Sequence, residues 1–389
     1  MNSRERLLGT LRREKVDRIP VAPLVYLNAV YEMFGYQPDI DTWPDPPDFD
    51  VIEKSIEYSD AFGFDAITFL GHVWDFYGWS TYNDSAVTRA SSDWDVTIAD
   101  ERKGDSKQRT ITIRTPQGEL KHVETYRKTS PYMVVWATQE YLIKTKDDFE
   151  IFRRYSPPAD VMDTRMVRRA KRAIGDKGIV MAGTQGAFNT LNVFRKLDQV
   201  LMDPVTDEGF YREMIEFFLG WLLKRVPRWV DAGADIIEIG ANLAGSSVGP
   251  RYFEKYVMEY EKRLIDAIHA TGVFVGYHNC GDAAKIMHLY NEMNFDYWGY
   301  LTPPPFGDVD LDEALRVLRA DMVLRGNIDQ VEFLRVAKPE QIRAKVRDLL
   351  QRVKARGNWI LSTTDFWIDH IPDENIRAFV DAGVEYGQY

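Results

Sequence analysis

The stretch EGFYREMIEFFLGWLLKRVPRWVDAGADIIEIG, residues 208–240, decides the fold of this chain. Its first part, residues 208–233, carries apolar side chains at helical spacing and ends in Gly233, a residue type that commonly terminates helices. Its second part, residues 234–240, is a short and nearly continuous apolar run, which is typical of a buried strand. The stretch therefore predicts a helix that leads directly into a strand covered on both faces.

The same unit recurs along the chain. Short apolar runs rich in β-branched or aromatic residues are each followed by a turn signal, and convincing helical patterns connect those in the second half. Continuous apolar strands that alternate with helices pair in parallel beneath a helical layer. Eight such units favour a TIM (β/α)8 barrel over an open doubly wound sheet. The expected strands are residues 19–24, 65–71, 178–184, 234–240, 272–279, 296–301, 321–328 and 358–365.

Residues 80–145 interrupt this alternation. The segment QRTITIRTPQGELKHVETYRK (108–128) has two alternating runs around a Thr-Pro-Gln-Gly turn, which is the pattern of an antiparallel hairpin. We expect residues 1–389 to form a single barrel domain with residues 80–145 as a hairpin inserted after the second strand. This insert is large enough to act as a lid over one end of the barrel.

Composition and charge limit the possible classes of function. The 389 residues are 45% hydrophobic, which is enough for a large core, and the net charge is -11. An acidic chain argues against a general nucleic-acid or anionic-membrane binder, and no apolar run of about 20 residues predicts a membrane helix. One cysteine and a charged start without a signal-peptide core lead us to expect a cytoplasmic protein.

Polar side chains collect at the expected carboxyl ends of the strands, where TIM barrels carry their active sites. His278 and Cys280 end the fifth strand and, two residues apart, face the same side of an extended chain. Imidazole and thiolate suit Zn²⁺, and Asp365 and Glu238 are the candidates for a further ligand. The alternative is a buried cysteine that packs as a small apolar residue beside a hydrogen-bonded histidine.

Glu238 lies inside the apolar strand at 234–240. A buried carboxylate is costly unless it is paired, binds a metal or takes part in catalysis. We therefore consider Glu238 a candidate catalytic residue or ligand, and the alternative is an ion pair with an arginine of the helical layer.

Aromatic residues crowd the loops near the expected mouth of the barrel. An aromatic lining suits a flat or methyl-bearing organic ligand. Ordinary packing between barrel, helices and lid explains most of these aromatic residues. The residues that we predict to contact substrate are Trp74, Tyr277, Tyr300 and Trp367.

With these residues in place, the sequence resembles the uroporphyrinogen decarboxylase superfamily over nearly its whole length. The resemblance rests on an ordered set of motifs, which is more specific than any one of them. These are RERLLGTLRREKVDRIPV (4–21), GADIIEIG (233–240), P-x-x-F-E-K-Y (250–256), H-x-C-G (278–281), GNID (326–329) and IPDENIRAFVDA (371–382).

The superfamily has one branch of metal-free decarboxylases and another of zinc-dependent methyltransferases that work with cobalamin. The decarboxylases hold a carboxylated substrate with arginines after the first strand, whereas this chain has no arginine between Arg18 and Gly35. They also carry an aspartate at the end of the second strand, where this chain reads FLGH with no carboxylate until Asp75. H-x-C-G is instead similar to the zinc-binding pair of the methyltransferases.

In the methyltransferase branch the third zinc ligand is a cysteine seven residues before the Pro of P-x-E-N. Counting back from Pro372 places Asp365 there, so the position matches but the residue is a carboxylate. A carboxylate makes the metal harder and more Lewis-acidic than a thiolate does. The resemblance therefore implies demethylation of an oxygen- or nitrogen-bound methyl group over methylation of a thiol.

The favoured hypothesis is a zinc-dependent methyltransferase that moves a methyl group from a small methylated substrate, such as an aromatic methyl ether, to a corrinoid protein. His278, Cys280 and Asp365 would bind zinc, Glu238 and Asn327 would act in catalysis, and the partner protein would supply the cobalamin. Analogy with the family also implies a homodimer. The alternatives are a metal-free decarboxylase or lyase of the uroporphyrinogen decarboxylase type, and a corrinoid- or tetrapyrrole-binding protein without catalytic activity.

Overall fold

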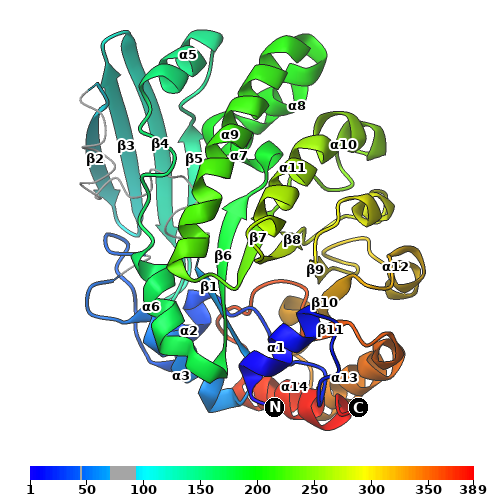
Figure 1. Cartoon of the computed structure of the whole chain (residues 1–389). Helices are drawn as coiled ribbons and strands as arrows, with labels where there is room; N and C mark the ends of the chain where they lie inside the picture. Colours follow the sequence, from blue (N-terminus) through cyan, green and yellow to red (C-terminus); the bar gives the residue numbers. More distant parts are fainter. Residues whose placement is uncertain (44–45, 71–92) are drawn as a thin grey trace.

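The computed structural model describes residues 1–43, 46–70 and 93–389 (Figure 1). Its main feature is a curled sheet of seven parallel strands, consistent with a TIM-like barrel. Seven of the eight expected strands are confirmed to within two residues at each end. In sheet order they are β1 (Ala66–Leu70), β6 (Gly178–Gln185), β7 (Ile236–Gly240), β8 (Phe274–His278), β9 (Tyr297–Leu301), β10 (Val323–Ile328) and β11 (Trp359–Thr363).

The first expected strand, residues 19–24, is an extended segment and not a regular strand. The Ala22 amide donates to the Leu361 carbonyl of β11 at 2.9 Å, and the Asp65 amide next to β1 donates to the Val21 carbonyl at 2.7 Å. The segment therefore lies between β11 and β1, in the gap that an eighth strand would fill. Two prolines in the segment lack the N–H donor, which prevents a continuous ladder.

The opening stretch folds as expected. Helix α9 (Glu208–Ala232) ends at Gly233, whose φ of 98° lies in the left-handed region that glycine adopts without strain. The chain then enters β7 three residues later, with every residue of the strand buried. This confirms a helix leading into a strand covered on both faces.

The other helices surround the parallel sheet or connect to it (Figure 1). They are α1 (Ser3–Leu11), α2 (Leu27–Met33), α3 (Val51–Phe62), α5 (Lys146–Tyr155), α6 (Arg165–Ile174), α7 (Ala187–Phe194), α8 (Leu197–Thr206), α10 (Pro250–Tyr256), α11 (Met258–His269), α12 (Leu311–Val317), α13 (Pro339–Val353) and α14 (Asp373–Tyr386). Short helical turns are η1 (Gly175–Lys177), η2 (Met287–Glu292), η3 (Gln330–Leu334) and η4 (Lys354–Arg356). Every helix in the described part of the chain is too short or too polar to cross a membrane.

A second sheet occupies much of the predicted insert. It is antiparallel, with strands β2 (Asp95–Lys103), β3 (Ser106–Thr115), β4 (Gly118–Lys128) and β5 (Val134–Glu140) in that order. The predicted hairpin corresponds to β3 and β4, which pair from Ser106 to Thr115 around the expected turn. Four strands form the sheet where the sequence suggested only two, because β2 and β5 extend the hairpin on both sides.

The small sheet is tied to the loop that follows β11. Ser130, between β4 and β5, donates to the Asp369 carboxylate at 2.5 Å, and Asn28 at the start of α2 donates to the same carboxylate at 2.9 Å. Asp369 is buried. Asp369 follows β11, and Asn28 follows the extended segment, so both lie at the carboxyl end of the parallel sheet. Through Ser130, the small sheet borders this end.

The apolar core has two parts on either side of the parallel strands. One cluster lies on the inner face of the curled sheet, and a much larger one lies between the strands and the helices. Alternate residues of a strand contribute to the two clusters, as period-two alternation requires. Representative inner residues are Leu7, Leu24, Met181, Ile236, Tyr297 and Ile360.

Candidate metal centre and active site

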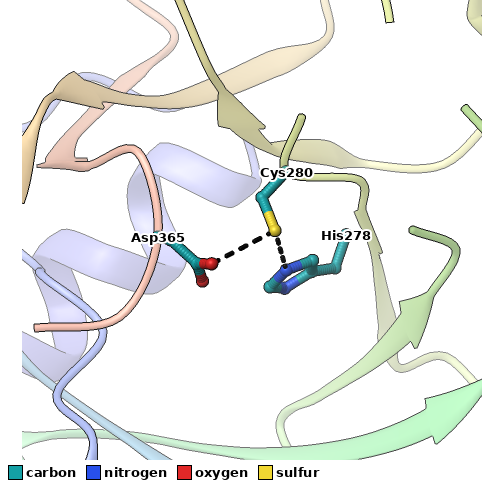
Figure 2. A group of neighbouring side chains, drawn as sticks. All are labelled: His278, Cys280 and Asp365. Carbon is teal, nitrogen blue, oxygen red and sulfur yellow. Dashed lines mark hydrogen bonds between the residues drawn. The ribbon is translucent and has the colours of Figure 1, made fainter. Parts of the chain in front are cut away.

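The three predicted metal ligands come together at the carboxyl ends of β8 and β11. His278 Nε2 lies 3.3 Å from Cys280 Sγ, which lies 3.3 Å from Asp365 Oδ2. One ligand atom from each residue falls within 4.8 Å of the other two. In Figure 2 the sulfur lies between the imidazole ring and the carboxylate. The prediction that these residues meet is confirmed.

Local structure holds each of the three side chains. His278 ends β8, and the next amide, that of Asn279, continues the pairing with Gly299 at 2.9 Å. The Cys280 amide donates to the side chain of Asn242 at 3.2 Å, which fixes the chain where it leaves the strand. Asp365 Oδ1 accepts from the amide of the next residue at 2.8 Å, so Oδ2 is the oxygen left to face the thiol.

Glu238 lies on the opposite side of the His278 ring from Cys280. Its Oε1 is 3.1 Å from His278 Nδ1, its Oε2 accepts from the Tyr297 hydroxyl, and the side chain is 1% exposed. Metal-binding histidines commonly use their second nitrogen to contact such a carboxylate, which fixes the ring. The geometry therefore favours a positioning role for Glu238 over the fourth-ligand role.

The arginine whose charge acts on Glu238 comes from the sheet, whereas the alternative interpretation placed an ion-pair partner in the helical layer. Arg325 of β10 is fully buried, donates to the Ala22 carbonyl at 2.9 Å and lies over the Tyr300 ring at 4.7 Å. Burial raises the pKa of Glu238, but the hydrogen bond and charge of His278, with the charge of Arg325, outweigh it and lower that pKa. Glu238 is therefore a buried carboxylate whose negative charge is stabilised by His278 and Arg325.

The three clustered groups also influence one another's protonation. Burial lowers the pKa of His278, but the contacts with Cys280 and Glu238 dominate and raise it well above its usual value. Burial raises the pKa of the Cys280 thiol, and the neighbouring Asp365 adds to this effect. When no cation is bound, hydrogen bonds link the thiol of Cys280 to the imidazole of His278 and to the carboxylate of Asp365. Nitrogen, sulfur and oxygen donors at this spacing fit Zn²⁺.

Of the predicted substrate-contacting aromatic residues, Tyr300 lies beside the cluster. Its ring centre is 4.9 Å from that of His278, and the side chain is fully buried. Phe366, which follows Asp365, is half-buried and has its ring centre 6.1 Å from that of His278. Tyr300 and Phe366 are thus the aromatic walls nearest to the candidate metal centre.

The placement of Tyr277 and Trp367 disagrees with the expectation that they contact substrate. Tyr277 stacks on Phe295 at 5.0 Å, and Trp367 packs against Phe379 of α14 at 5.6 Å. Both are fully buried between the sheet and its outer layer. For Tyr277 the reason is strand alternation, because the neighbour of the inward-facing His278 points outward. Trp367 lies in the loop after β11.

The two remaining predicted residues have different outcomes. Trp74 lies outside the described residues. Asn327 lies in β10, two residues after Arg325, and its side chain is half-buried. It is paired in register with Ser362 of β11. Its catalytic role stays a prediction.

Three residues that contact the site escaped the sequence reasoning. Asn242 stands at the end of the fourth expected strand, in the segment EIGAN, so its position carried a usable signal. Arg325 is a charged residue inside an apolar strand, the same signal that pointed to Glu238. Tyr297 carried no such signal in the sequence, because a tyrosine in an apolar strand is typical of a core residue.

The chain is similar in sequence and fold to known proteins. The family model of uroporphyrinogen decarboxylase (URO-D) matches residues 137–386, a range that contains all three clustered residues. A uroporphyrinogen decarboxylase from Gloeobacter violaceus is 22% identical over 254 residues, which cover 61% of this chain and 69% of that protein. The methylcobamide:CoM methyltransferase MtbA from Methanosarcina mazei is 20% identical over 255 residues, covering 64% and 70%.

Among solved structures, a methyltransferase from Methanosarcina mazei has the same fold. It superposes with a TM-score of 0.68 at 14% sequence identity and covers 99% of both chains. Since the family model spans well over half of the sequence, this chain belongs to the uroporphyrinogen decarboxylase family.

Proposed function

We propose that the chain is a zinc-dependent methyltransferase, the demethylase component of a system that moves a methyl group to a corrinoid protein. The substrate is a small molecule whose methyl group is bound to oxygen or nitrogen, such as an aromatic methyl ether. One observation carries this proposal: His278, Cys280 and Asp365 present three different donor atoms within 4.8 Å of one another. A chain without a metal would have little reason to gather these groups at the ends of two separate strands.

In this proposal His278 Nε2, Cys280 Sγ and Asp365 Oδ2 hold zinc, which when bound supplies a Lewis acid for the heteroatom that carries the methyl group. The other residues position these ligands. Glu238 holds the His278 ring through Nδ1, and Asn242 holds the backbone at Cys280. The partner corrinoid protein supplies the cobalamin that receives the methyl group.

The relatives support a methyltransferase without fixing its substrate. MtbA is described as a methylcobamide:CoM methyltransferase, and the structurally similar Methanosarcina mazei protein is a methyltransferase. Asp365 argues for a harder metal than a second thiolate would make, which favours an oxygen or nitrogen substrate. A single domain, a lid role for residues 80–145, a catalytic role for Asn327 and a homodimer are further parts of the proposal.

Metal analysis and a methyl-transfer assay test the proposed function. We expect about one zinc per chain in protein purified without chelator, and a loss of most of it in Cys280→Ser and Asp365→Ala. His288→Gln is the matched control, because His288 is exposed and outside the cluster. Wild-type protein should also methylate cob(I)alamin from an aromatic methyl ether. Wild-type protein free of zinc would refute the proposal.

A metal-free decarboxylase is the second candidate, because the family model and the Gloeobacter violaceus relative carry that activity in their names. It predicts release of carbon dioxide from a carboxylated tetrapyrrole at a rate that a chelator leaves unchanged. The absence of arginine from residues 19–34 speaks against it, since nothing cationic there would hold the carboxylates.

A further inference from the structure

The candidate metal centre consists of two halves that come from different parts of the sheet. His278 and Cys280 belong to one chain segment, at the end of β8, and Asp365 belongs to another, in the loop after β11 (Figure 2). Strands β9 and β10 lie between β8 and β11 in the sheet. The distance between the two halves therefore depends on the loops that follow β9 and β10.

Side chains from both of these loops hold Thr364, the residue before Asp365. The Thr364 hydroxyl donates to Gln330 Oε1, in the loop after β10, at 2.8 Å. The Thr302 hydroxyl, in the loop after β9, lies 3.3 Å from the Thr364 carbonyl oxygen and 3.3 Å from that of Tyr300, so it can donate to either. Thr302, Gln330 and Thr364 are each at most 5% exposed. These three side chains form a buried hydrogen-bond network beside the carboxylate.

The loop after β9 also contacts the segment that follows the cysteine. Gly307 of this loop packs between the backbone of Thr302 and that of Gly281, so closely that a β-carbon at position 307 would lie 2.3 Å from the first carbonyl oxygen and 2.7 Å from the second. Asp308, the next residue, accepts from the amide of Ala283 at 2.7 Å. Close packing and hydrogen bonds thus connect the two halves of the metal centre through the loop after β9.

The Thr364 hydroxyl is well placed to control where the carboxylate lies. Its loss would leave Gln330 Oε1 buried without a donor, which is unfavourable, so we expect the loop after β11 to rearrange. Asp365 would move with that loop, because the Thr363 hydroxyl donates to the Asp365 carbonyl at 2.5 Å and joins the three residues into one turn. Zinc requires ligand distances within about 0.2 Å of their usual values, so a small shift is enough to weaken the site.

We propose that Thr302, Gln330 and Thr364 are positioning residues that set the distance between the cysteine half and the carboxylate half of the metal centre. Their hydrogen bonds hold the loop after β11 against the loops after β9 and β10, which orients Asp365 towards Cys280. The identification of the metal as zinc rests on the proposed function. The network of hydrogen bonds does not depend on it.

Zinc affinities of variants of the full chain test the proposal. Thr364→Val keeps the shape of the side chain and removes its hydroxyl. We expect it to lower the zinc affinity by about tenfold or more, which is typical of changes to residues that support metal ligands. Thr364→Ser keeps the hydroxyl and should bind zinc nearly as the wild type does. Competition with a coloured zinc chelator measures the affinities, and wild-type affinity in Thr364→Val would overturn the proposal.

Thr164→Val is the matched control, since it also removes a hydroxyl from a buried threonine. Thr164 precedes α6, and its hydroxyl accepts from Arg168 at 3.0 Å, outside the cluster. Both valine variants should unfold at a lower temperature in the absence of zinc, but only Thr364→Val should bind zinc more weakly. Equal losses of affinity in the two variants would reduce the network to a general structural role and overturn the proposal.

A double variant tests whether Thr364 and Gln330 act as one unit. Gln330→Leu removes the acceptor, and by itself it should weaken zinc binding about as much as Thr364→Val does. The two changes together should cost little more than either alone, because the same hydrogen bond can be lost only once. Losses that simply add would mean that the two side chains act independently, and the proposed network would be wrong.

The network and the proposed function can fail separately. A chain whose zinc affinity responds to Thr364→Val as expected, but which transfers no methyl group, retains the network and loses the function. An active, zinc-bound enzyme whose zinc affinity ignores Thr364→Val retains the function and loses the network. A wild-type chain that binds no zinc overturns both.

Discussion

Cys280 Sγ lies 3.3 Å from Asp365 Oδ2, although the two residues are 85 positions apart in the sequence. Parallel strands β8 and β11 end at the same edge of the sheet, which brings the residues that follow them to one place. The carboxylate stands where the methyltransferases that the chain resembles have a cysteine. The pair is therefore the point at which this chain departs from that pattern.

Replacing the carboxylate with a thiol should change the substrate preference and keep the metal. We expect Asp365→Cys to bind zinc as the wild type does, since thiolates are good zinc ligands. A softer donor set makes the metal a weaker Lewis acid, so transfer from O-methyl substrates should fall relative to S-methyl substrates by about tenfold, or about 1.4 kcal/mol. Rates with a matched pair of methyl ether and thioether donors measure this ratio.

The control for that experiment is Asp381→Cys, which adds a thiol at an exposed position of α14. It should leave the ratio of the two rates unchanged. An Asp365→Cys enzyme with the wild-type ratio would show that the carboxylate has no part in selecting the substrate.

The carboxylate of Glu238 should matter for metal affinity even though it lies behind the histidine. Glu238→Gln keeps the size of the side chain and removes the charge that holds His278 Nδ1 at 3.1 Å. Changes of this kind typically cost about 10- to 100-fold in metal affinity. Tyr297→Phe, which removes only the hydroxyl that contacts Glu238, should cause a smaller loss. Competition with a coloured zinc chelator measures both affinities.

Thermal unfolding without zinc separates positioning from general destabilisation, because a purely structural role would lower stability and leave the zinc affinity of the folded protein unchanged. Wild-type affinity in Glu238→Gln would therefore contradict the positioning role.

Much of the fold and the three residues of the cluster could be predicted from the sequence, for identifiable reasons. Short, nearly continuous apolar runs such as residues 234–240, repeated between helical patterns, are typical of buried parallel strands, and Gly233 marks the end of the preceding helix. His278 and Cys280 stand out because they follow each other at i and i+2 at a strand end, where TIM barrels carry their active sites. Asp365 was a candidate, with Glu238, because it ends the last expected strand, and the resemblance favoured it through its distance from Pro372.

What the sequence could not provide was the direction of individual aromatic side chains. Tyr277 and Tyr300 both stand in apolar strands, yet one packs on Phe295 and the other on His278. Which side a residue faces depends on the register of its strand, and a shift of one residue reverses it. The irregular extended segment at 19–24 was also unforeseen in detail, although its two prolines argue against a regular strand.

Glu261 of α11 should make stability fall as the pH rises. The carboxyl group is fully buried and accepts from the Phe188 amide at 3.3 Å, and burial raises its pKa from 4.5 to about 8. Below the unfolded-state pKa the group is protonated in both states, so its full contribution is present. That contribution is lost as the pH rises through about 8, at a cost on the order of a few kcal/mol.

Glu261→Gln should remove this pH dependence, because an amide has no proton to lose in this range. Urea unfolding between pH 5 and pH 9 measures this dependence, as the difference in the free energy of unfolding between variant and wild type at each pH. Glu259→Gln, at an exposed position of the same helix, is the control and should follow the wild type. A constant difference across the range would show that Glu261 is ionised throughout.

Asp65 should be among the most important residues for stability at the seam between the extended segment and β1. Its carboxylate is fully buried and accepts from Arg6 at 2.6 Å and from Arg18 at 2.8 Å. It also accepts from the Val21 amide at 2.9 Å, which fixes the segment that fills the gap in the sheet. Removing it leaves two nearly buried guanidinium groups without this compensation, which typically costs about 3–5 kcal/mol.

Urea unfolding at pH 7 therefore should show Asp65→Asn destabilised by several times more than Asp60→Asn. Asp60 pairs with Lys177 at 2.5 Å, but both side chains are about half exposed, and such surface pairs contribute about 1 kcal/mol or less. Zinc content provides the second measurement, since the cluster lies at the other end of the strands and should survive in folded Asp65→Asn. Equal destabilisation by the two variants would mean that backbone hydrogen bonds hold the segment, from Ala22 to Leu361 of β11 and from the Asp65 amide to Val21, without help from the carboxylate.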